Sequence, residues 1–591
     1  MGSETRICQS CKQNFVIEPD DFSYYEKIQV PPPTWCPDCR LQRRLIWRNE
    51  RTLFKRKCNA PGHSEDLIST YSPEIQIPVY DHDYWYSDAW DANDYGRDYD
   101  FNRPFFDQYK ELLFQAPHLP LFDSKSTNSS FCNITVELKN CYLVTAGWGN
   151  EDSIHCNRIS YCKDTVDSYV CHKTEFGYEN VYCEDSYKLL FSLRAENCRE
   201  SYFLYDCRNC SNCVCCTNLR NKQYYIFNQP YSKDEYFKKL EKLNLENRDG
   251  IQKIRERFNE LKLKAIHRYA KLTNTERVIG DNIEKSKNLY YCFDIPGEAE
   301  NSKYCHWATK GLKDSYDTGP GTGGNSELTY EGISIGVTNS NCKFGAIIWY
   351  SRDVQYSFNC QDSHDLFGCA NLRKKQYCIL NKQYTKEEYN KLIPKIIEHM
   401  NNMPYVDKKG RVYKYGEFFP AETSPYAYNE TVAQDYVPLE KKTCIDNGFN
   451  WRDREQKQYQ ISLPAEKIPF AIDSVSEEII NENLGCSHNG NCNDQCTRAF
   501  RVTKQEFEFY KRMKLPIPNL CPNCRHYQRV KQRNPLKLWH RSCMCDYQVF
   551  PNTTKHSHHL KVKCPNEFET SYSPDRKEII YCEQCYNAEV A

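Results

Sequence analysis

Four cysteines near the N-terminus have the types and the spacing that bind a tetrahedral metal ion. Cys8 and Cys11 form one CxxC pair, and Cys36 and Cys39 form a second pair after 24 further residues. Two such pairs of thiolates are the usual ligands of structural zinc, and four thiolates leave no open position for catalysis. A segment of this size buries little apolar surface, so the metal would supply much of its folding free energy. The sequence therefore predicts a structural zinc site.

The same pattern returns 485 positions further along the chain without a gap. One ligand departs from the pattern, because Asn493 stands opposite Cys8. The neighbouring Cys492 is the expected substitute, and Cys486 is the weaker candidate. The ligands predicted for the second zinc site are Cys492, Cys496, Cys521 and Cys524.

The C-terminal tail carries a third group of cysteines. Cys545 is an alternative to Cys543 in this group. Histidines in the segment 556–559 (His556, His558 and His559) are metal ligands by type, but an exposed loop is the favoured interpretation. Two to three structural Zn²⁺ ions are therefore expected per chain. The ligands predicted for the third site are Cys543, Cys564, Cys582 and Cys585.

Five further cysteines lie close together between Cys207 and Cys216. Their CxxCxxC spacing is that of iron–sulfur ligation. The chain repeats this region 153 positions later, where Ser363, Leu366 and Gly368 replace three of the cysteines. Stacked buried thiols are therefore the preferred interpretation, and a bound cluster with a redox role is the alternative.

A basic segment follows the second CxxC pair of each copy. Leucines and arginines after Cys39 alternate at helical spacing, so a basic helix is predicted to begin at this pair. Zinc ligation does not explain why the arginines recur in both copies. Interleaved aromatic residues such as Trp47 and Trp539 suit single-stranded nucleic acid, while a protein partner or a solvated helix face stays open. The predicted partner-binding residues are Arg40, Arg43, Arg44, Arg48, Arg525, Arg529 and Arg533.

These motifs carry a resemblance to known proteins. The first CxxC pair, Phe15, the prolines at 31–33 and the CPxCR motif ending at Arg40 resemble a treble-clef zinc-binding domain found in many uncharacterised bacterial proteins. The whole chain is also similar to a group of long, uncharacterised, Cys- and Tyr-rich zinc-ribbon proteins of uncultivated bacteria. That group shares the order of zinc module, Cys/Tyr repeats and zinc module. Neither resemblance implies an activity.

The middle of the chain is repetitive. Small polar residues precede Tyr or Cys again and again, as in Asn140-Cys-Tyr142 and Asp185-Ser-Tyr187. Short bursts of polar–apolar alternation with Asn, Ser and Asp at the corners predict a β-solenoid in which like residues form ladders. A second duplication ends each array with Ser232 or Thr385 followed three residues later by Glu, which predicts a capping box at the start of a helix.

The expected fold is multidomain and mainly β with α. Treble-clef or zinc-ribbon modules at both ends flank two duplicated β-solenoid-like Cys/Tyr arrays, each closed by a capping helix. A chain of 591 residues is too long for a single core. The expected divisions are an N-terminal zinc module at 1–58, an aromatic and acidic connector at 59–124, a first array with its cap helix at 125–245, a helical linker at 246–275, a second array with its cap helix at 276–400, a connector at 401–485, a second zinc module at 486–542 and a zinc ribbon at 543–591.

Composition sets few limits on the partner. The 79 basic and 79 acidic residues cancel, so binding to nucleic acid would have to rest on local patches. The sequence contains no apolar run long enough to span a membrane and no apolar signal core at its N-terminus. We therefore expect a cytoplasmic protein, without a membrane partner, whose cysteines are reduced thiols and metal thiolates.

The expected function is that of a noncatalytic zinc-binding scaffold or adaptor that engages a protein or nucleic-acid partner through the basic helices. An RNA- or DNA-binding protein proper is the first alternative. A carbohydrate-active or redox enzyme built on the solenoid is the second, although no Ser/His/Asp, Cys/His or paired-carboxylate constellation stands out. The sequence identifies no small-molecule substrate.

Overall fold

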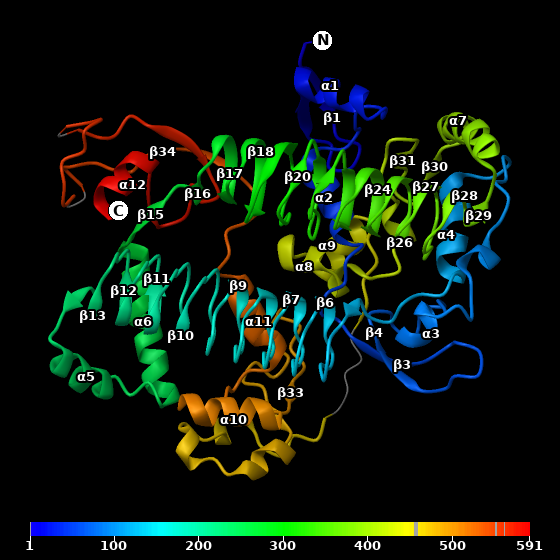
Figure 1. Cartoon of the computed structure of the whole chain (residues 1–591). Helices are drawn as coiled ribbons and strands as arrows, with labels where there is room; N and C mark the ends of the chain where they lie inside the picture. The colour runs from blue at the N-terminus through cyan, green and yellow to red at the C-terminus, as the bar shows by residue number, and fades with distance from the viewer. Residues whose placement is uncertain (1, 454–458, 550–551, 561, 591) are drawn as a thin grey trace.

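The structure is a computed structural model in which residues 2–453, 459–549, 552–560 and 562–590 are described. Two arrays of stacked strands lie side by side at its centre, drawn in cyan and in green in Figure 1. The blue N-terminal segment packs against the green array, and the orange C-terminal helices lie beside the cyan array. The N-terminal segment and the C-terminal helices drawn in orange therefore each lie against the array that is further away in sequence.

The first array is a stack of parallel strands wound at a constant offset. Pairs such as Asn133↔Thr145 and Asn157↔Tyr169 are 12 residues apart, so one coil holds 12 residues. The antiparallel strand at its end pairs with the last coil. The strands are β5 (Asp123–Ser124), β6 (Asn133–Val136), β7 (Thr145–Trp148), β8 (Asn157–Ser160), β9 (Tyr169–His172), β10 (Tyr187–Leu190), β11 (Arg199–Tyr205), β12 (Ser211–Thr217), β13 (Gln223–Ile226) and β14 (Gln229–Pro230).

A three-residue period underlies these coils. Every third residue from Lys125 to Phe227 has a positive φ, near +50°, so the backbone turns a corner after each triplet. Twelve residues per coil and three per side give four sides. Asn and Asp recur at the corners, where their short polar side chains reduce the cost of the left-handed conformation. The residue after each corner points inward and is usually small, as at Cys132, Thr165 and Ser192.

The cysteines of the first array form part of this narrow interior. Cys156 and Cys183 are completely buried, and each thiol donates to the carbonyl oxygen two residues earlier, at 3.3 and 3.5 Å. Cysteine suits this position because it is small, apolar and a weak donor. Every cysteine is a free thiol in the part of the chain that the structure describes.

The second array winds in the same way with less regular coils. Its parallel pairs are 11 to 14 residues apart, for example Glu276↔Lys287 and Leu312↔Ser326. The strands β19, β20, β22, β24, β23 and β21 pair in a closed ring. The strands are β16 (Leu272–Thr273), β17 (Glu276–Glu284), β18 (Lys287–Ile295), β19 (Ala299–Lys303), β20 (Leu312–Lys313), β21 (Tyr316–Thr318), β22 (Ser326–Glu327), β23 (Tyr330–Gly336), β24 (Ser340–Trp349), β25 (Arg352–Gln355), β26 (Phe358–Gln361), β27 (His364–Phe367), β28 (Gln376–Ile379) and β29 (Lys382–Gln383).

Helices follow both arrays. Ser232 and Thr385 are N-caps that accept hydrogen bonds from Glu235 and Glu388, and both predicted capping boxes are present. The second helix after the first array packs on its last coils. The helices are α5 (Lys233–Lys242), α6 (Arg248–Lys264) and α7 (Lys386–Asn402). No helix within the described ranges is both long and apolar enough to cross a membrane.

The N-terminal module begins with a hairpin and continues with two helices. A second hairpin and two helices of the connector follow, and the segment after α7 contributes two short helices between the arrays. Aromatic side chains join these parts, as where Trp47 packs on Phe419 with ring centroids 4.6 Å apart. The elements are β1 (Glu4–Ile7), β2 (Asn14–Ile17), α1 (Pro19–Lys27), α2 (Pro37–Leu45), β3 (Phe54–Lys57), β4 (Asp66–Ser69), α3 (His82–Tyr86), α4 (Phe105–Gln115), α8 (Val432–Tyr436) and α9 (Lys441–Asp446).

The C-terminal module repeats the order of hairpin and two helices. Its last strand pairs in parallel with a strand between α6 and the second array, which attaches the tail to the middle of the chain. The elements are β15 (Ile266–Arg268), β32 (Leu484–Gly485), β33 (Ala499–Phe500), α10 (Lys504–Met513), α11 (Pro522–Val530), β34 (Trp539–Ser542), β35 (Glu567–Thr570), β36 (Ile579–Tyr581) and α12 (Glu583–Val590).

Candidate metal centres and the surfaces that dock them

The first group of cysteines joins a hairpin turn to a helix. Cys8 and Cys11 lie in the turn between β1 and β2, and Cys36 is the N-cap of α2. The ligand atoms of Cys8, Cys11, Cys36 and Cys39 all lie within 4.8 Å of one another, and the Cys11 and Cys36 sulfurs are 3.7 Å apart. Zn–S bonds of 2.3 Å in a tetrahedron place two sulfurs about 3.8 Å apart. The group therefore fits a metal ion as it stands.

The second group has the same construction with one change of ligand. Cys486 follows β32 directly, as Cys8 follows β1, and its sulfur lies 3.8 Å from that of Cys524. Cys492, which the sequence favoured, is also 3.8 Å from Cys524. The connection between β32 and β33 is longer than the turn between β1 and β2, and it brings both Cys486 and Cys492 close to Cys524. The cysteines within 4.8 Å of one another are Cys486, Cys496, Cys521 and Cys524.

The third group forms in the tail. All four cysteines are buried, and Cys543 rather than Cys545 belongs to the four-cysteine group. The sulfurs of Cys564 and Cys582 are 3.9 Å apart, and the Cys582 backbone N–H donates to Cys543 Sγ at 3.2 Å. Such N–H···S bonds favour thiolate ligands. The group consists of Cys543, Cys564, Cys582 and Cys585.

The histidines of the tail are placed differently from the prediction. An exposed loop was expected at 556–559, but His556 is completely buried and His559 is 6% exposed. Both face Cys545 and lie within 3.5 Å of its sulfur. The burial of these histidines could not be predicted from the sequence, because it depends on how Cys545 and Cys585 fold against the segment 556–559.

The arginines of α2 do not form an exposed basic surface. Arg40 and Arg44 are at most 1% exposed, and both contact Asp317 of the second array, at 2.8 and 3.2 Å. Asp317 is completely buried at a corner of a coil. Although burial opposes a charged guanidinium, the Asp317 carboxylate raises the pKa of Arg40 well above its ordinary value. The prediction that Arg40 and Arg44 bind an outside partner assumed that their side chains are exposed, and this assumption is wrong.

Arg43, the third arginine of α2, is also buried against carboxylates. It donates to Glu331 at 2.6 Å and to Glu417 at 2.8 Å, and its guanidinium lies 4.4 Å from the ring centre of Trp35. Burial raises the pKa of Glu331, and the neighbouring arginines oppose that rise. The carboxylates that pair with Arg40, Arg43 and Arg44 come from the second array and from the later connector.

The arginines of α11 repeat the arrangement on the first array. Arg525 and Arg529 are 3% and 2% exposed, and both pair with the completely buried Asp167, Arg529 at 2.8 Å. Arg525 also contacts Glu506 of α10 at 3.2 Å. Burial opposes ionisation of Glu506, but His155 and Arg525 outweigh it and lower the pKa of Glu506 to about 2. The duplicated arginines thus have duplicated intramolecular partners.

The remaining two predicted arginines are also engaged inside the chain. Arg48 is 3% exposed and pairs with Glu50 at 2.7 Å. Arg533 is half-buried, donates to the Tyr169 hydroxyl at 3.1 Å and also to the backbone of Asp435. Neither is presented on an open helix face.

Four of the five cysteines between 207 and 216 belong to the inward-facing row of the first array, and the fifth, Cys215, occupies a corner with φ +53° and packs outside that row. Cys207, Cys210, Cys213 and Cys216 are at most 1% exposed. Their thiols donate to backbone carbonyls of their own coils at distances from 3.2 to 3.5 Å. This arrangement is that of stacked buried thiols, as expected from the sequence.

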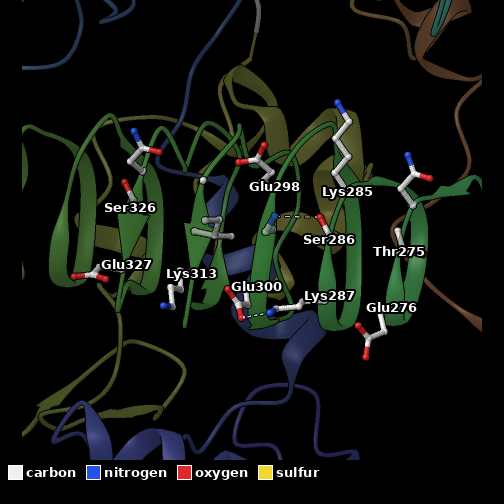
Figure 2. A pocket seen from close by; sticks show the side chains of 15 residues that line it. Thr275, Glu276, Lys285, Ser286, Lys287, Glu298, Glu300, Lys313, Ser326 and Glu327 are labelled. Atoms are coloured by element: carbon white, nitrogen blue, oxygen red, sulfur yellow. Dashed lines mark hydrogen bonds and ion pairs between the residues drawn. The ribbon is translucent and has the colours of Figure 1, made fainter.

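The second array also carries a shallow groove on its surface, shown in Figure 2. One wall is a ladder in which acidic and basic residues alternate from coil to coil. Lys287 and Glu300 in this ladder form an ion pair of 2.8 Å. The ladder consists of Glu276, Lys287, Glu300, Lys313 and Glu327.

We compared the chain with known protein families and with curated proteins. No family model matches the chain, and no curated protein matches it. The resemblance to treble-clef domains therefore rests on the motifs quoted from the sequence.

Proposed function

We propose that this chain is a noncatalytic zinc-binding scaffold in which metal modules at both ends hold two coiled arrays together. The observation that carries the proposal is the pairing of Arg40 and Arg44 with Asp317, repeated by Arg525 and Arg529 with Asp167. Each pair of arginines starts one turn or less after a metal-ligating cysteine of α2 or α11. Metal binding therefore sets the orientation of the helix that docks.

Zinc is the metal that the ligand sets favour. Tetrahedral groups of four thiolates select zinc or iron–sulfur centres among the biological metals, and CxxC pairs in a hairpin turn and at a helix N-terminus are typical of structural zinc. Such a site has no open position for a substrate or water. The order of hairpin, helix and ligand-bearing helix also supports treble-clef modules at both ends. We propose three ions of this kind.

A protein is the partner that we propose for the scaffold. The seven predicted arginines are occupied inside the chain, so they no longer support binding to RNA or DNA. The groove of Figure 2 alternates carboxylates with ammonium groups, and its carboxylates would repel phosphates while its mixed charges suit a peptide surface. The 34 cysteines, all free, support a reducing compartment such as the cytoplasm.

Loss of one metal site tests the bracing role. In a Cys11→Ser variant of the full chain, the backbone amides of β21 and β23 should lose hydrogen-exchange protection, because α2 lies against these strands. A Cys58→Ser variant serves as the control, since Cys58 lies in the same module but outside the four-cysteine group. Equal protection in the two variants would contradict the proposal.

Two binding experiments test the choice of partner. Fluorescence anisotropy with labelled single-stranded RNA and DNA at low salt should show no saturable binding below about 10 μM; tight, salt-sensitive binding would restore the nucleic-acid alternative. A tagged chain carrying Lys287→Glu and Lys313→Glu should lose a protein that co-purifies with the wild-type chain from its source cells. The control is Lys12→Glu, at an exposed residue of the N-terminal hairpin turn.

A further inference from the structure

We infer that the tail binds a second metal ion beside its four-cysteine site. The group lies in the C-terminal segment, next to α12. Cys585 would bridge the two ions through its thiolate. The proposed ligands of the additional ion are Cys545, His556, His559 and Cys585.

Distances between the ligand atoms fit a tetrahedral ion with mixed ligands. Cys545 Sγ lies 3.4 Å from His556 Nδ1 and 3.5 Å from His559 Nε2. The two histidine nitrogens are 3.1 Å apart, and His559 Nε2 is 3.3 Å from Cys585 Sγ. Zn–S bonds of about 2.3 Å and Zn–N bonds of about 2.05 Å predict S···N separations of about 3.5 Å and N···N of about 3.3 Å. The four atoms therefore surround one position for an ion.

The other ring nitrogen of each histidine has a partner that fixes its orientation. His556 Nε2 lies 2.9 Å from Glu589, whose carboxylate also accepts from the backbone N–H of Thr553 at 2.8 Å. His559 Nδ1 lies 2.9 Å from the carbonyl oxygen of Val562, to which it donates. These contacts leave His556 Nδ1 and His559 Nε2 without a proton and facing the two sulfurs. Histidines that ligate metals are usually held in this way.

Charge also favours two ions. The tail brings five thiolates together, namely Cys543, Cys545, Cys564, Cys582 and Cys585. One divalent ion on four thiolates leaves a net charge of −2 with the fifth thiol close by. Two divalent ions on five thiolates leave −1. The second ion therefore reduces the repulsion within a buried cluster.

His558 is the alternative ligand and provides a control. Its Nε2 lies 3.3 Å from Cys585 and 3.4 Å from Cys564, so it faces sulfurs of the four-cysteine group. Its ring is half-buried, whereas His556 and His559 are buried.

Metal counting in full-length variants tests the inference. Native mass spectrometry of the wild-type chain should show one zinc ion more than the three four-cysteine groups hold. His556→Gln and Cys545→Ser should each lose one ion, and His558→Gln should lose none. Three ions in the wild-type chain would overturn the inference, as would loss of an ion in His558→Gln but not in His556→Gln. The three four-cysteine sites would remain in either case, so failure here differs from failure of the scaffold proposal.

Spectroscopy of the wild-type chain avoids the risk that a variant misfolds. After replacement of zinc by ¹¹³Cd, the NMR spectrum should contain one resonance of a site with two sulfur and two nitrogen ligands. That resonance should be split by coupling to a second cadmium through the bridging sulfur of Cys585. All-thiolate resonances alone would overturn the additional site, and a mixed-ligand resonance without coupling would overturn the bridge.

Discussion

Removing the charge of Asp167 should detach α11 from the first array. Asp167 faces two buried guanidinium groups, those of Arg525 and Arg529. It occupies a corner of the coil with φ +51°, a conformation that Asn tolerates as well as Asp. Asp167→Asn therefore changes the charge with little change in backbone preference. Asp164→Asn is the matched control, because Asp164 lies one corner earlier with φ +47° and pairs with the half-exposed Arg512.

The burial of each ion pair determines how much stability Asp167→Asn and Asp164→Asn lose. Asp167 and Arg529 have side-chain exposures of 0% and 3%, and removing one partner of a buried ion pair costs about 3–5 kcal/mol. Arg525 keeps Glu506, so we expect the lower end of this range. The Asp164–Arg512 pair has exposures of 13% and 50%, and such pairs contribute about 0–1 kcal/mol. A loss of about 3 kcal/mol raises the population of the open state more than 100-fold.

Native-state hydrogen exchange measures the detachment of α11 from the first array at the amides of that helix. The amides of α11 should exchange more than about 100-fold faster in Asp167→Asn than in the wild type, in buffer saturated with zinc so that metal binding stays constant. The same amides in Asp164→Asn should change by less than about fivefold. Equal exchange rates in the two variants would show that the buried arginines do not depend on Asp167, and would refute the docking argument.

Three further predictions follow from individual residues. Cys486→Ser should lose one zinc ion by mass spectrometry whereas Cys492→Ser should not, because Cys486 belongs to the second four-cysteine group; the reverse result would return the ligand to Cys492. Burial, helped by Arg56, lowers the pKa of His118 to about 4, so the unfolded chain binds the proton first as the pH falls. The stability that neutral His118 contributes is therefore complete above its ordinary pKa of 6.5 and is lost as the pH falls from 6.5 to about 4. In His118→Gln, the free energy of unfolding measured with urea should fall by up to about 3 kcal/mol less than in the wild type across that pH range. The same pH dependence in both proteins would contradict this prediction. A water-soluble thiol reagent should leave Cys183 unlabelled in the native chain and label it in urea, because its side chain is completely buried; rapid native labelling would show that the array opens.

The grouping of the cysteines was the part of the candidate sites that the sequence predicted best. Ligand spacing within a CxxC turn is local, so three of the four ligands in the second group followed from alignment alone. Cys486 was ranked too low because the connection before Cys496 is longer than in the first copy, and alignment without a gap pointed to Cys492. The position of β32, which the sequence did not indicate, brings Cys486 into the four-cysteine group.

The coil geometry was predicted only in outline. Repeats of Cys and Tyr indicated stacked coils, but their irregular spacing concealed a three-residue period. That period becomes visible when Ser, Thr and Asn are placed in the same row as Cys, as in Cys141, Val144, Gly147 and Asn150. Small side chains of different chemistry share a row because a narrow interior selects for size.

The docking of the arginines could not be predicted from the sequence. Arg40 and Asp317 are 277 residues apart, and no local pattern connects a module to the array that is further away. One signal was available, because arginines duplicated beyond the needs of zinc ligation imply a duplicated partner. Asp167 belongs to the repeated Asp-Ser-Tyr motif, while Asp317 follows another copy of it. A comparison of the duplicated arginines with the repeated Asp-Ser-Tyr motif would have suggested an ion pair within the chain.

Metal analysis of the intact chain tests the central claim most directly. In the proposed scaffold each of the three four-cysteine groups binds one zinc ion, and the proposed mixed Cys/His site raises the number to four. Inductively coupled plasma mass spectrometry of protein purified under reducing conditions should therefore find three or four zinc ions and no iron. Two or fewer zinc ions, or iron as the main metal, would contradict the account of this protein as a scaffold held together by zinc modules.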